Sequence, residues 1–202
     1  MDLSASMGFI GSVDRFEVAC HLSESLALSA TRIGDRFGMI GAGGVAKRRF
    51  FCATRARSAA LEAVARIRRE GPQGAGVGDL AECAALLGAT RKFVILISDF
   101  RWPPEQIRGV FDAFALHDLA PLVLVDSSET KPPRWGLLEL VDSETRDRRL
   151  LFMRPALRQR WIDAEAARRQ RIAQIAVTSA RAPIFIEDQV DARAISQQLM
   201  AA

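Results

Sequence analysis

The pattern of hydrophobic and polar positions along the chain predicts a mixed α/β protein. Several segments have apolar residues at a helical period, so that each of them would bury one face of a helix. The helices that we predict cover residues 12–32, 58–70, 79–88, 103–118, 155–179 and 191–200. Continuous apolar runs of strand length mark the most buried strands, because strands inside a parallel sheet are covered on both faces. These strands cover residues 92–100, 119–126 and 183–187.

Two β-hairpins complete the predicted elements. Residues 36–40 and 46–52 are β-type runs separated by a glycine-rich turn at 41–44, which is the composition of a hairpin. Residues 135–153 contain two alternating runs around a polar turn at 142–147. Both segments are therefore predicted to form antiparallel strand pairs.

The order of these elements predicts one open, mostly parallel sheet with helices on both faces. Strand 92–100, helix 103–118 and strand 119–126 follow one another, which is the order of a right-handed crossover unit. The chain has 202 residues, of which 49% are hydrophobic and 26% charged, so it can bury one substantial core and we expect a single domain over residues 1–202. In sheets of this kind ligands collect at the carboxyl ends of the strands.

Composition limits where this domain works. The longest apolar runs are far shorter than the roughly 20 residues that span a bilayer, and the first residues lack the basic and apolar segments of a secretory signal. Cys20, Cys52 and Cys83 are odd in number and far apart, which argues against both a disulfide framework and a zinc site. We therefore expect a cytoplasmic protein with buried thiols and no membrane segment.

The net charge of +4 comes largely from arginines in residues 47–57 and 146–181. A balance of this size permits contacts with nucleic acid or acidic proteins without requiring either. The predicted helix 155–179 has an apolar stripe, with the arginines mostly off it. The stripe contains Leu157, Trp161, Ala164, Ile172 and Ile175. A solvated basic face is the simpler interpretation, because few aromatic residues are present to stack on bases. We expect no nucleic acid, and an acidic protein partner stays open.

The first candidate for chemistry is the start of the chain, where Asp2, Ser4 and Ser6 stand at alternate positions. Carboxylate and hydroxyl oxygens suit a hard cation such as Mg²⁺, which takes near-octahedral oxygen ligands and keeps some of its waters. Ser98 and Asp99 follow the most buried strand, at the sheet edge where ligands bind. Each cluster alone has an equally simple interpretation as a helix cap or a turn. Together they favour one metal site formed by Asp2, Ser4, Ser6 and Asp99.

These motifs resemble a known family. The segment DLSASM before a helix and ISDF after a buried strand are similar to the metal-ion-dependent adhesion site of von Willebrand factor A domains. The closer resemblance is to the bacterial family called domain of unknown function 58, whose members usually accompany MoxR-type AAA+ ATPases. HDLAPLVLVDSSE and PPRWGLLELVDSETRD resemble later stretches of that family, so the likeness covers nearly the whole chain.

The resemblance implies a binding site and not a catalytic one. By analogy with the family, Ser4 and Ser6 coordinate Mg²⁺ or Mn²⁺ through their hydroxyls, while Asp2 and Asp99 act mainly through bound water. Neutral hydroxyl ligands leave the ion partly uncompensated, so it keeps affinity for a carboxylate of a partner protein. The implied partner is a MoxR-type AAA+ ATPase that acts with this domain in maturation or assembly of other proteins, with methanol dehydrogenase as one concrete client.

Two departures from the family pattern change what is expected. Gly78 stands where the family has a threonine in a Gly-Thr-Asp/Asn-Leu-like turn, so one hydroxyl ligand is missing, Asp79 or water must substitute, and metal binding should be weaker. The family also places a central strand directly before the Asp-x-Ser-x-Ser turn, whereas Met1 precedes Asp2 here. We therefore expect that the central strand is missing and that the sequence is the C-terminal part of a longer protein, because neighbouring strands would otherwise have unpaired edges.

A dinucleotide-binding enzyme is the alternative class of function. Gly41, Gly43 and Ala46 fit the G-x-G-x-x-G/A pattern after a strand, and Glu62 follows about twenty residues later. The glycines should then open a helix, but residues 47–51 are basic and β-rich, and Glu62 falls inside a predicted helix. The hairpin turn is therefore the favoured interpretation, and neither glycine-rich loop continues as a P-loop.

Catalysis by the candidate residues has little support in the sequence. Aspartyl phosphotransfer at Asp2 would need a second carboxylate two residues later, where Ser4 stands. His21 lies within a predicted helix and His117 at a helix end, and we expect a satisfied cap or a surface position for each. The sequence therefore favours a non-enzymatic, metal-dependent interaction domain, with a small nucleotide-binding α/β enzyme as the alternative.

Overall fold

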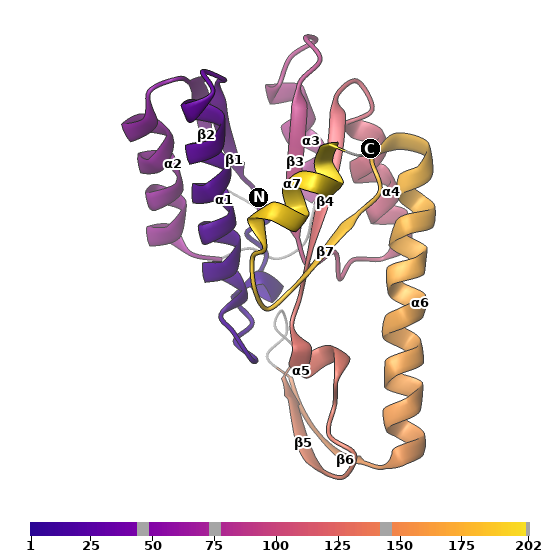
Figure 1. Cartoon of the computed structure of the whole chain (residues 1–202). Helices are drawn as coiled ribbons and strands as arrows, with labels where there is room; N and C mark the ends of the chain where they lie inside the picture. Colours follow the sequence, from indigo (N-terminus) through magenta and orange to yellow (C-terminus); the bar gives the residue numbers. More distant parts are fainter. Residues whose placement is uncertain (44–48, 73–77, 142–146, 201–202) are drawn as a thin grey trace.

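The computed structural model describes residues 1–43, 49–72, 78–141 and 147–200. Figure 1 shows a parallel sheet in the middle of the molecule, an antiparallel hairpin beside it and a second hairpin that projects from one end. The strands are β1 Phe37–Gly41, β2 Arg49–Thr54, β3 Phe93–Ser98, β4 Asp118–Val125, β5 Gly136–Val141, β6 Arg148–Met153 and β7 Ile184–Glu187. The helices are the 3₁₀ turn η1 Ala5–Gly8 and α1 Arg15–Arg32, α2 Arg57–Glu70, α3 Gly78–Leu86, α4 Pro104–Ala113, α5 Ser127–Thr130, α6 Pro155–Ser179 and α7 Ala192–Met200.

The central sheet consists of β3, β4 and β7, which are parallel, with β4 in the middle. Leu122 of β4 lies opposite Ile97 of β3 and Ile184 of β7. Every residue of β4 from Leu119 to Val125 is buried, as expected of an uninterrupted apolar run with a neighbouring strand on each side. The structure therefore confirms the α/β class and the three parallel strands that the apolar runs predict.

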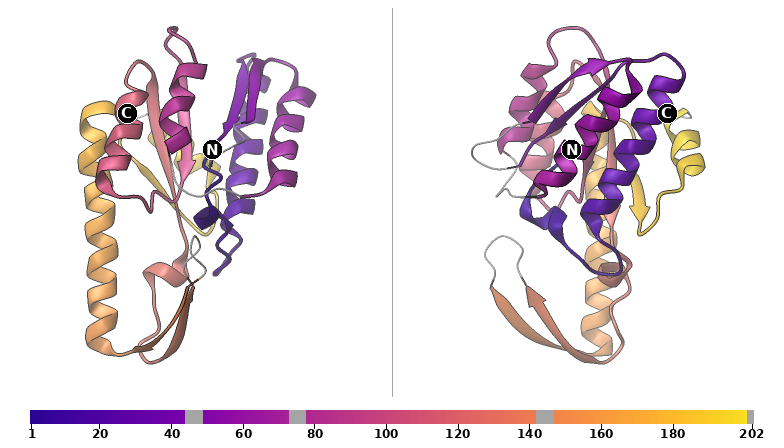
Figure 2. Two further views of the ribbon diagram at one scale, coloured as in Figure 1. Left: turned by 180° about the vertical axis from the view of Figure 1, so that it is seen from behind. Right: turned by 90° about the vertical axis from the view of Figure 1, so that its left-hand side faces the viewer.

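Two hydrophobic cores lie on opposite faces of this sheet, because successive β4 side chains point to opposite sides. Leu122 and Leu124 join the core that contains residues of α1, α2, β1, β7 and α7. Val123 and Val125 join the core that contains residues of α3, α4 and α6. Helices therefore cover both faces, as predicted, and Figure 2 shows α6 and the α1–α2 pair on opposite sides of the strands.

Residues 1–3 lie between β1 and β3 and connect the β1–β2 hairpin to the parallel sheet. On one side, the amide of Asp2 donates to the carbonyl of Ile97 in β3 at 2.9 Å. On the other side, the amide of Leu3 donates to the carbonyl of Ala42, just after β1, at 2.7 Å. This stretch therefore takes a strand position at the carboxyl end of β3, and it fixes the point at which the chain turns into η1.

Gly41 and Gly43 let the end of β1 approach this segment closely. A Cβ at Gly43 would lie 2.3 Å from the carbonyl carbon of Leu3, and a Cβ at Gly41 would lie 2.7 Å from the Leu3 side chain. Both glycines therefore have a packing role. Ala46, the third residue of the dinucleotide pattern, lies outside the described residues, and Glu62 is an exposed residue of α2.

The end of α4 differs from the expectation. The predicted helix 103–118 ends at Ala113, because the chain then turns back toward β4, with the amide of His117 donating to the carbonyl of Phe114 at 2.8 Å. His117 is 5% exposed, and its ring lies 6.4 Å from the ring of Phe114. The expectation of a surface position or a cap for His117 is therefore wrong.

The cysteines agree with the expectation in part. Cys20 and Cys83 are buried, whereas Cys52 on β2 is exposed, and no disulfide joins these three described residues. None of the helices in the described ranges combines the length and apolarity needed to cross a membrane.

The two turns predicted at residues 41–44 and 142–147 can be compared with the structure only in part. Residue 44 of the first turn and residues 142–146 of the second lie outside the described residues.

Replacing Gly43 by alanine should destabilise the fold, since the added methyl group overlaps the backbone of Leu3. We expect a loss of roughly 1–3 kcal/mol in the free energy of unfolding, the usual range for an overpacked site, measured by urea denaturation. Gly109→Ala is the control, because a Cβ at this position in α4 would meet no atom within 4 Å, and it should stabilise the helix by about 0.5–1 kcal/mol. Equal stability of the two variants would contradict the role assigned to Gly43.

Candidate functional site

The start of the chain and the exit of β3 meet through Asp2, whose carboxylate is fully buried. Oδ1 of Asp2 accepts from the amide of Ser4 at 2.8 Å, and Oδ2 accepts from the hydroxyl of Ser98 at 2.6 Å. Ser98 is the last residue of β3, so a direct side-chain contact joins the two loops. The contact forms here because the backbone of Asp2 is already fixed against β3.

Ser4, Ser6 and Asp99 lie around the same point. The hydroxyls of Ser4 and Ser6 are 3.1 Å apart. One nitrogen of Arg15, Nη1, donates both to the carbonyl of Ser6 at 3.0 Å and to Oδ2 of Asp99 at 2.7 Å. The structure thus brings together the four residues that the sequence singles out, Asp2, Ser4, Ser6 and Asp99, at the carboxyl end of β3.

The backbone after Asp99 is strained. Phe100 has a φ of 49°, a left-handed conformation that a bulky residue rarely adopts, and its side chain is fully buried. The amide of Phe100 donates to the hydroxyl of Ser98 at 3.0 Å, and the amide of Arg101 donates to Oδ1 of Asp99 at 3.2 Å. Strain of this kind persists where the surroundings fix it, and here the burial of Phe100 and these two hydrogen bonds fix the turn that carries Asp99.

The surroundings of Asp2 disfavour its ionised form. Burial, followed by the negative charge of Asp99, raises the pKa of Asp2 to about 6, although hydrogen bonds from Ser98 and Ser4 oppose the shift. A divalent cation beside the two carboxylates would favour their ionised forms. The donor atoms are all oxygens of carboxylates and hydroxyls, a set that suits Mg²⁺ or Mn²⁺ better than Zn²⁺.

Arg15 is a central residue of the site that the sequence pattern does not reveal. Its side chain is 3% exposed, and Nη2 donates to Glu129 at 2.6 Å while Nη1 pairs with Asp99. Its guanidinium carbon also lies 4.9 Å from the centre of the Phe9 ring. A buried arginine is costly without paired carboxylates, so Arg15 and its partners depend on one another. The pattern misses it because a charge in the first turn of a helix usually faces water, and its partners are 84 and 114 residues away.

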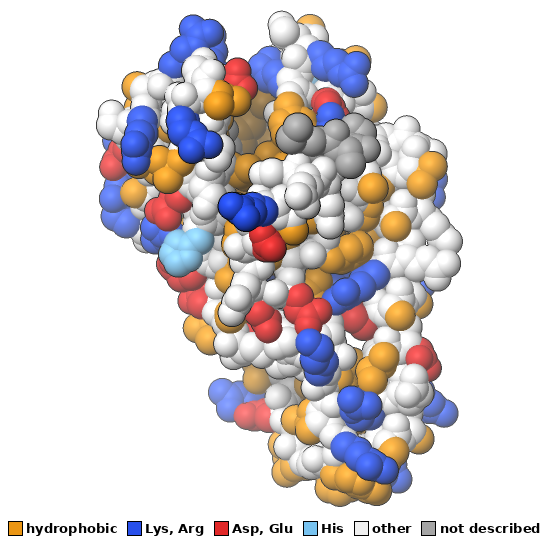
Figure 3. All heavy atoms as spheres, viewed as in Figure 1, with side chains coloured by type: hydrophobic (Ala, Val, Ile, Leu, Met, Phe, Trp, Pro, Cys, Tyr) orange, Lys and Arg blue, Asp and Glu red, His pale blue; other side chains and the backbone are white. Residues whose placement is uncertain are grey.

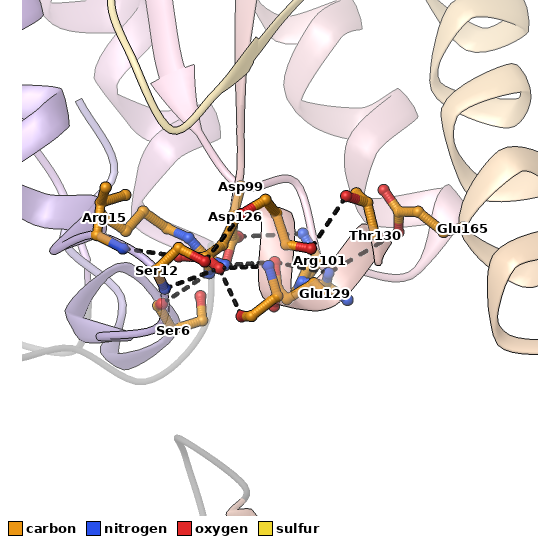
Figure 4. A network of polar contacts seen from close by, with 12 residues as sticks. Ser6, Ser12, Arg15, Asp99, Arg101, Asp126, Glu129, Thr130 and Glu165 are labelled. Carbon is orange, nitrogen blue, oxygen red and sulfur yellow. Dashed lines mark hydrogen bonds and ion pairs between the residues drawn. The ribbon is translucent and has the colours of Figure 1, made fainter. Parts of the chain in front are cut away.

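Further ion pairs connect the site to α5 and α6, as Figure 4 shows. Arg101 contacts Glu129 at 3.0 Å and Glu165 at 3.8 Å. Glu165 also pairs with Arg168 at 2.8 Å and with Arg169 at 3.3 Å. Burial opposes the ionisation of Glu165, but the hydrogen bond and charge of Arg168 outweigh it, so the pKa of Glu165 lies below its usual value. Three arginines, Arg101, Arg168 and Arg169, therefore hold the carboxylate of Glu165 in place.

Glu165 corrects the stripe predicted for α6. The sequence pattern places Ala164 on the buried side, but in the structure Ala164 is exposed and Glu165 is buried. Ile172 and Ile175 are buried as predicted. A charged residue can occupy the buried position because arginines pair with it.

A further buried carboxylate, Asp126, fixes the loop before α1. It accepts from the amides of Ser12 at 3.1 Å, Val13 at 3.3 Å and Ser128 at 2.8 Å. Burial opposes its ionisation, but the hydrogen bond from the hydroxyl of Ser128, together with those from the amides, outweighs the effect and keeps the pKa of Asp126 below its usual value. The cavity beside it has a volume of about 10 Å³, which is room for about one water molecule and too small for a substrate.

The other candidates contribute less to the site. Gly78 begins α3 and has no hydroxyl to offer, and Asp79 lies in the first turn of that helix. Within the described ranges, no contact links Asp79 to the four oxygen-bearing residues. His21 is exposed, 3.9 Å from Glu17. Because no three His, Cys, Asp or Glu side chains gather as a metal site in the part of the chain that the structure describes, a cation here would depend on hydroxyl ligands.

Asp2→Asn should stabilise the protein at neutral pH when no divalent cation is present. The pKa of Asp2 rises from 3.8 to about 6 on folding, so the folded protein loses stability as the pH rises through this interval. A shift of about two pKa units corresponds to roughly 3 kcal/mol, a cost that the neutral amide avoids. In EDTA, thermal melting should show a gain near neutral pH that largely disappears at about pH 4. A gain independent of pH would contradict the buried-charge explanation.

Comparison with known proteins identifies relatives of unknown role. The family profile described as "Protein of unknown function DUF58" matches residues 1–172. An uncharacterized protein in the moxR 3′ region of Paracoccus denitrificans is 37% identical over 89 residues, which make up 42% of this chain and 85% of that protein. The match therefore spans most of the Paracoccus protein but less than half of this one.

Two solved structures have a similar fold. The conserved hypothetical protein BatB from Bacteroides thetaiotaomicron superposes with a TM-score of 0.55 at 17% identity, covering 99% of this chain and 94% of that chain. An aerotolerance-related membrane protein from Bacteroides fragilis, with multiple mutations to serine, gives a TM-score of 0.56 at 17% identity and covers 100% of this chain and 96% of its own. At this identity the likeness concerns the fold alone. The profile match over most of the sequence shows that the chain belongs to the DUF58 family of proteins of unknown function.

Proposed function

We propose that this chain is a von Willebrand A-like, metal-dependent protein-interaction domain and not an enzyme. The observation that carries the proposal is the convergence of two buried carboxylates and two hydroxyls at the carboxyl end of the parallel sheet. In this proposal Asp2, Ser4, Ser6 and Asp99 hold Mg²⁺ or Mn²⁺, cations that prefer oxygen ligands and keep some of their waters.

The proposed ligands neutralise only part of the positive charge of the cation. Ser4 and Ser6 contribute neutral hydroxyl oxygens, and the two carboxylates act mainly through bound water. A cation in such a site attracts a further carboxylate, which a partner protein can supply. The contacts of the cluster are hydrogen bonds and ion pairs among Asp, Ser and Arg side chains, with no histidine among the described contacts, which favours binding over acid–base catalysis.

Arg15 sets the expected strength of the metal site. Its guanidinium pairs with Oδ2 of Asp99, so part of the negative charge that would attract a cation is already compensated. Oδ1 of Asp99 accepts from the amide of Arg101 at 3.2 Å, a longer and weaker contact. Together with the missing hydroxyl at Gly78, these contacts lead us to expect weak metal binding that a partner's carboxylate strengthens.

The partner in this proposal is a MoxR-type AAA+ ATPase. Membership of the DUF58 family and a relative in the moxR 3′ region of Paracoccus denitrificans support it. The pair would act in maturation or assembly of other proteins, with methanol dehydrogenase as one client. Because the ATPase needs ATP, we propose that the domain works in the cytoplasm.

Titration calorimetry with MgCl₂ and MnCl₂ tests the metal site. Ser4→Ala and Asp99→Asn should each weaken metal affinity by at least about tenfold, as expected when a ligand or its support is removed. Ser25→Ala is the matched control, because the hydroxyl of Ser25 donates to the carbonyl of His21 within α1, and its affinity should not change. Metal affinity that is the same in all three variants would refute the site, and a nicotinamide cofactor that binds without any metal response would support the enzyme alternative.

Binding to the MoxR-type ATPase encoded in the same genome should depend on the divalent cation. In biolayer interferometry we expect EDTA to abolish binding, excess Mg²⁺ to restore it, and Asp99→Asn to weaken it by about tenfold or more. Ser25→Ala should bind as the wild type does. Equal binding in EDTA and in Mg²⁺ would show that the contact does not use the proposed site.

A further inference from the structure

The hairpin formed by β5 and β6 projects away from the rest of the molecule, beside the first half of α6 (Figures 1 and 2). In its antiparallel register Leu137 lies opposite Phe152, Glu139 opposite Leu150, and Val141 opposite Arg148. Side chains that lie opposite one another share a face, and residues two apart on one strand share it as well. These six residues therefore form one face of the hairpin, called here the outer face.

The outer face is largely apolar and exposed. Leu150 is 71% exposed, Leu137 64% and Phe152 55%. Trp135, just before β5, is 57% exposed, and its ring centre lies 6.3 Å from that of Phe152. An antiparallel pair with one solvated face normally carries polar residues there, and contiguous exposed apolar side chains indicate an interaction site.

Arginines lie at both ends of the outer face. Arg134 and Arg154 flank the hairpin at its base and are exposed, and within the described ranges neither has an ion-pair partner. Arg149, which lies opposite Leu140, belongs to the other face. Arg148 pairs with Glu139 at 3.3 Å. Figure 3 shows basic side chains around a group of apolar ones at the lower end of the molecule. The hairpin therefore presents an apolar centre with a positively charged rim, and its natural complement is an apolar cleft with an acidic rim.

We infer that the β5–β6 hairpin inserts into an apolar, acid-rimmed cleft of a partner protein. A second copy of this chain is a poor occupant, because a symmetric contact would bring the same arginines together. A lipid bilayer is also a poor occupant, because the Glu139–Arg148 pair on the outer face would lose its water in hydrocarbon. A protein cleft can accept the apolar residues and meet the arginines with carboxylates.

The hairpin is also connected to the candidate metal site. It lies in sequence between α5, which carries Glu129, and α6, which carries Glu165, and both glutamates contact Arg101 at that site. A partner that supplies a carboxylate to the metal would therefore also bind the hairpin in the same complex. The identification of that partner as the ATPase rests on the proposed function, whereas the docking surface does not.

Photocrosslinking in the native host tests the inference. The crosslinking residue p-benzoylphenylalanine is placed at Leu150 or, as a control, at Leu116, which is exposed to the same extent, 70% against 71%. We expect a protein to be captured at position 150 and not at 116. After purification, that protein should bind the wild type, lose at least about tenfold in affinity for a Leu150→Ser/Phe152→Ser variant, and bind Leu116→Ser normally. Its affinity should also fall as salt is raised.

Several results would overturn the inference. They are capture of this chain alone, no capture at position 150, or a captured protein that binds the double variant as tightly as the wild type. A vesicle flotation experiment with phosphatidylglycerol and phosphatidylcholine tests a membrane as the occupant. If the wild type floats with the vesicles, the double variant does not, and no protein is captured, the hairpin binds a membrane instead. Circular dichroism and Mg²⁺ titration of the double variant serve as folding controls.

The two proposals fail in different ways. If the captured protein is not the MoxR-type ATPase, the docking surface is supported and the identification of the partner is wrong. If the ATPase binds in a Mg²⁺-dependent way but tolerates Leu150→Ser/Phe152→Ser, the docking surface falls and the proposed function stands. Capture of the ATPase at position 150, with weaker binding by the double variant, supports both.

Discussion

The candidate site depends on the backbone of residues 1–3, which is hydrogen-bonded to β3 through Ile97 and to the end of β1 through Ala42. Because these bonds fix Asp2 beside the exit of β3, its buried carboxylate can accept from Ser98, and Arg15 can contact both the carbonyl of Ser6 and Asp99. The close approach needs glycine at position 43, where a Cβ would overlap the backbone. The clustering of these oxygens is thus a consequence of strand-like pairing between segments far apart in the sequence.

Charge compensation organises the rest of this end of the molecule. Two acidic groups at the site, Asp2 and Asp99, differ in environment: Asp99 pairs with Arg15, whereas the carboxylate of Asp2 accepts hydrogen bonds from neutral groups. Burial, followed by the charge of Asp99, raises the pKa of Asp2. From Arg15 the ion pairs continue through Glu129 and Arg101 to α6. Arg15 and Asp99 are both buried, so loss of either one would leave a buried charge unpaired. The network as a whole joins α1, the exit of β3, α5 and α6.

The sequence predicts the parts of the fold that depend on local pattern. The apolar runs of β3 and β4 identify the buried strands. Because ligands bind at the carboxyl ends of such strands, the residue after β3, Asp99, is found as a candidate. Arg15 and Glu129 could not be found in this way, because a charge in a short polar segment or a first helical turn normally faces water. Pairing with Asp99 and Glu129, 84 and 114 residues away, makes the burial of Arg15 tolerable. Glu165 shows the same limit, since the apolar period of α6 favours Ala164 in its place, and the burial of His117 depends on a turn that ends α4 earlier than the pattern indicates.

The central claim is that oxygens of Asp2, Ser4, Ser6 and Asp99 surround one divalent cation. The most direct measurement is a crystal structure grown with Mn²⁺, in which anomalous scattering locates the ion. The account predicts an anomalous peak next to the hydroxyls of Ser4 and Ser6, with Asp2 and Asp99 close by. A map at saturating Mn²⁺ with no peak there, and with Arg15 still bridging Asp99 and the carbonyl of Ser6, would show that the arginine takes the place of a metal and would contradict the account.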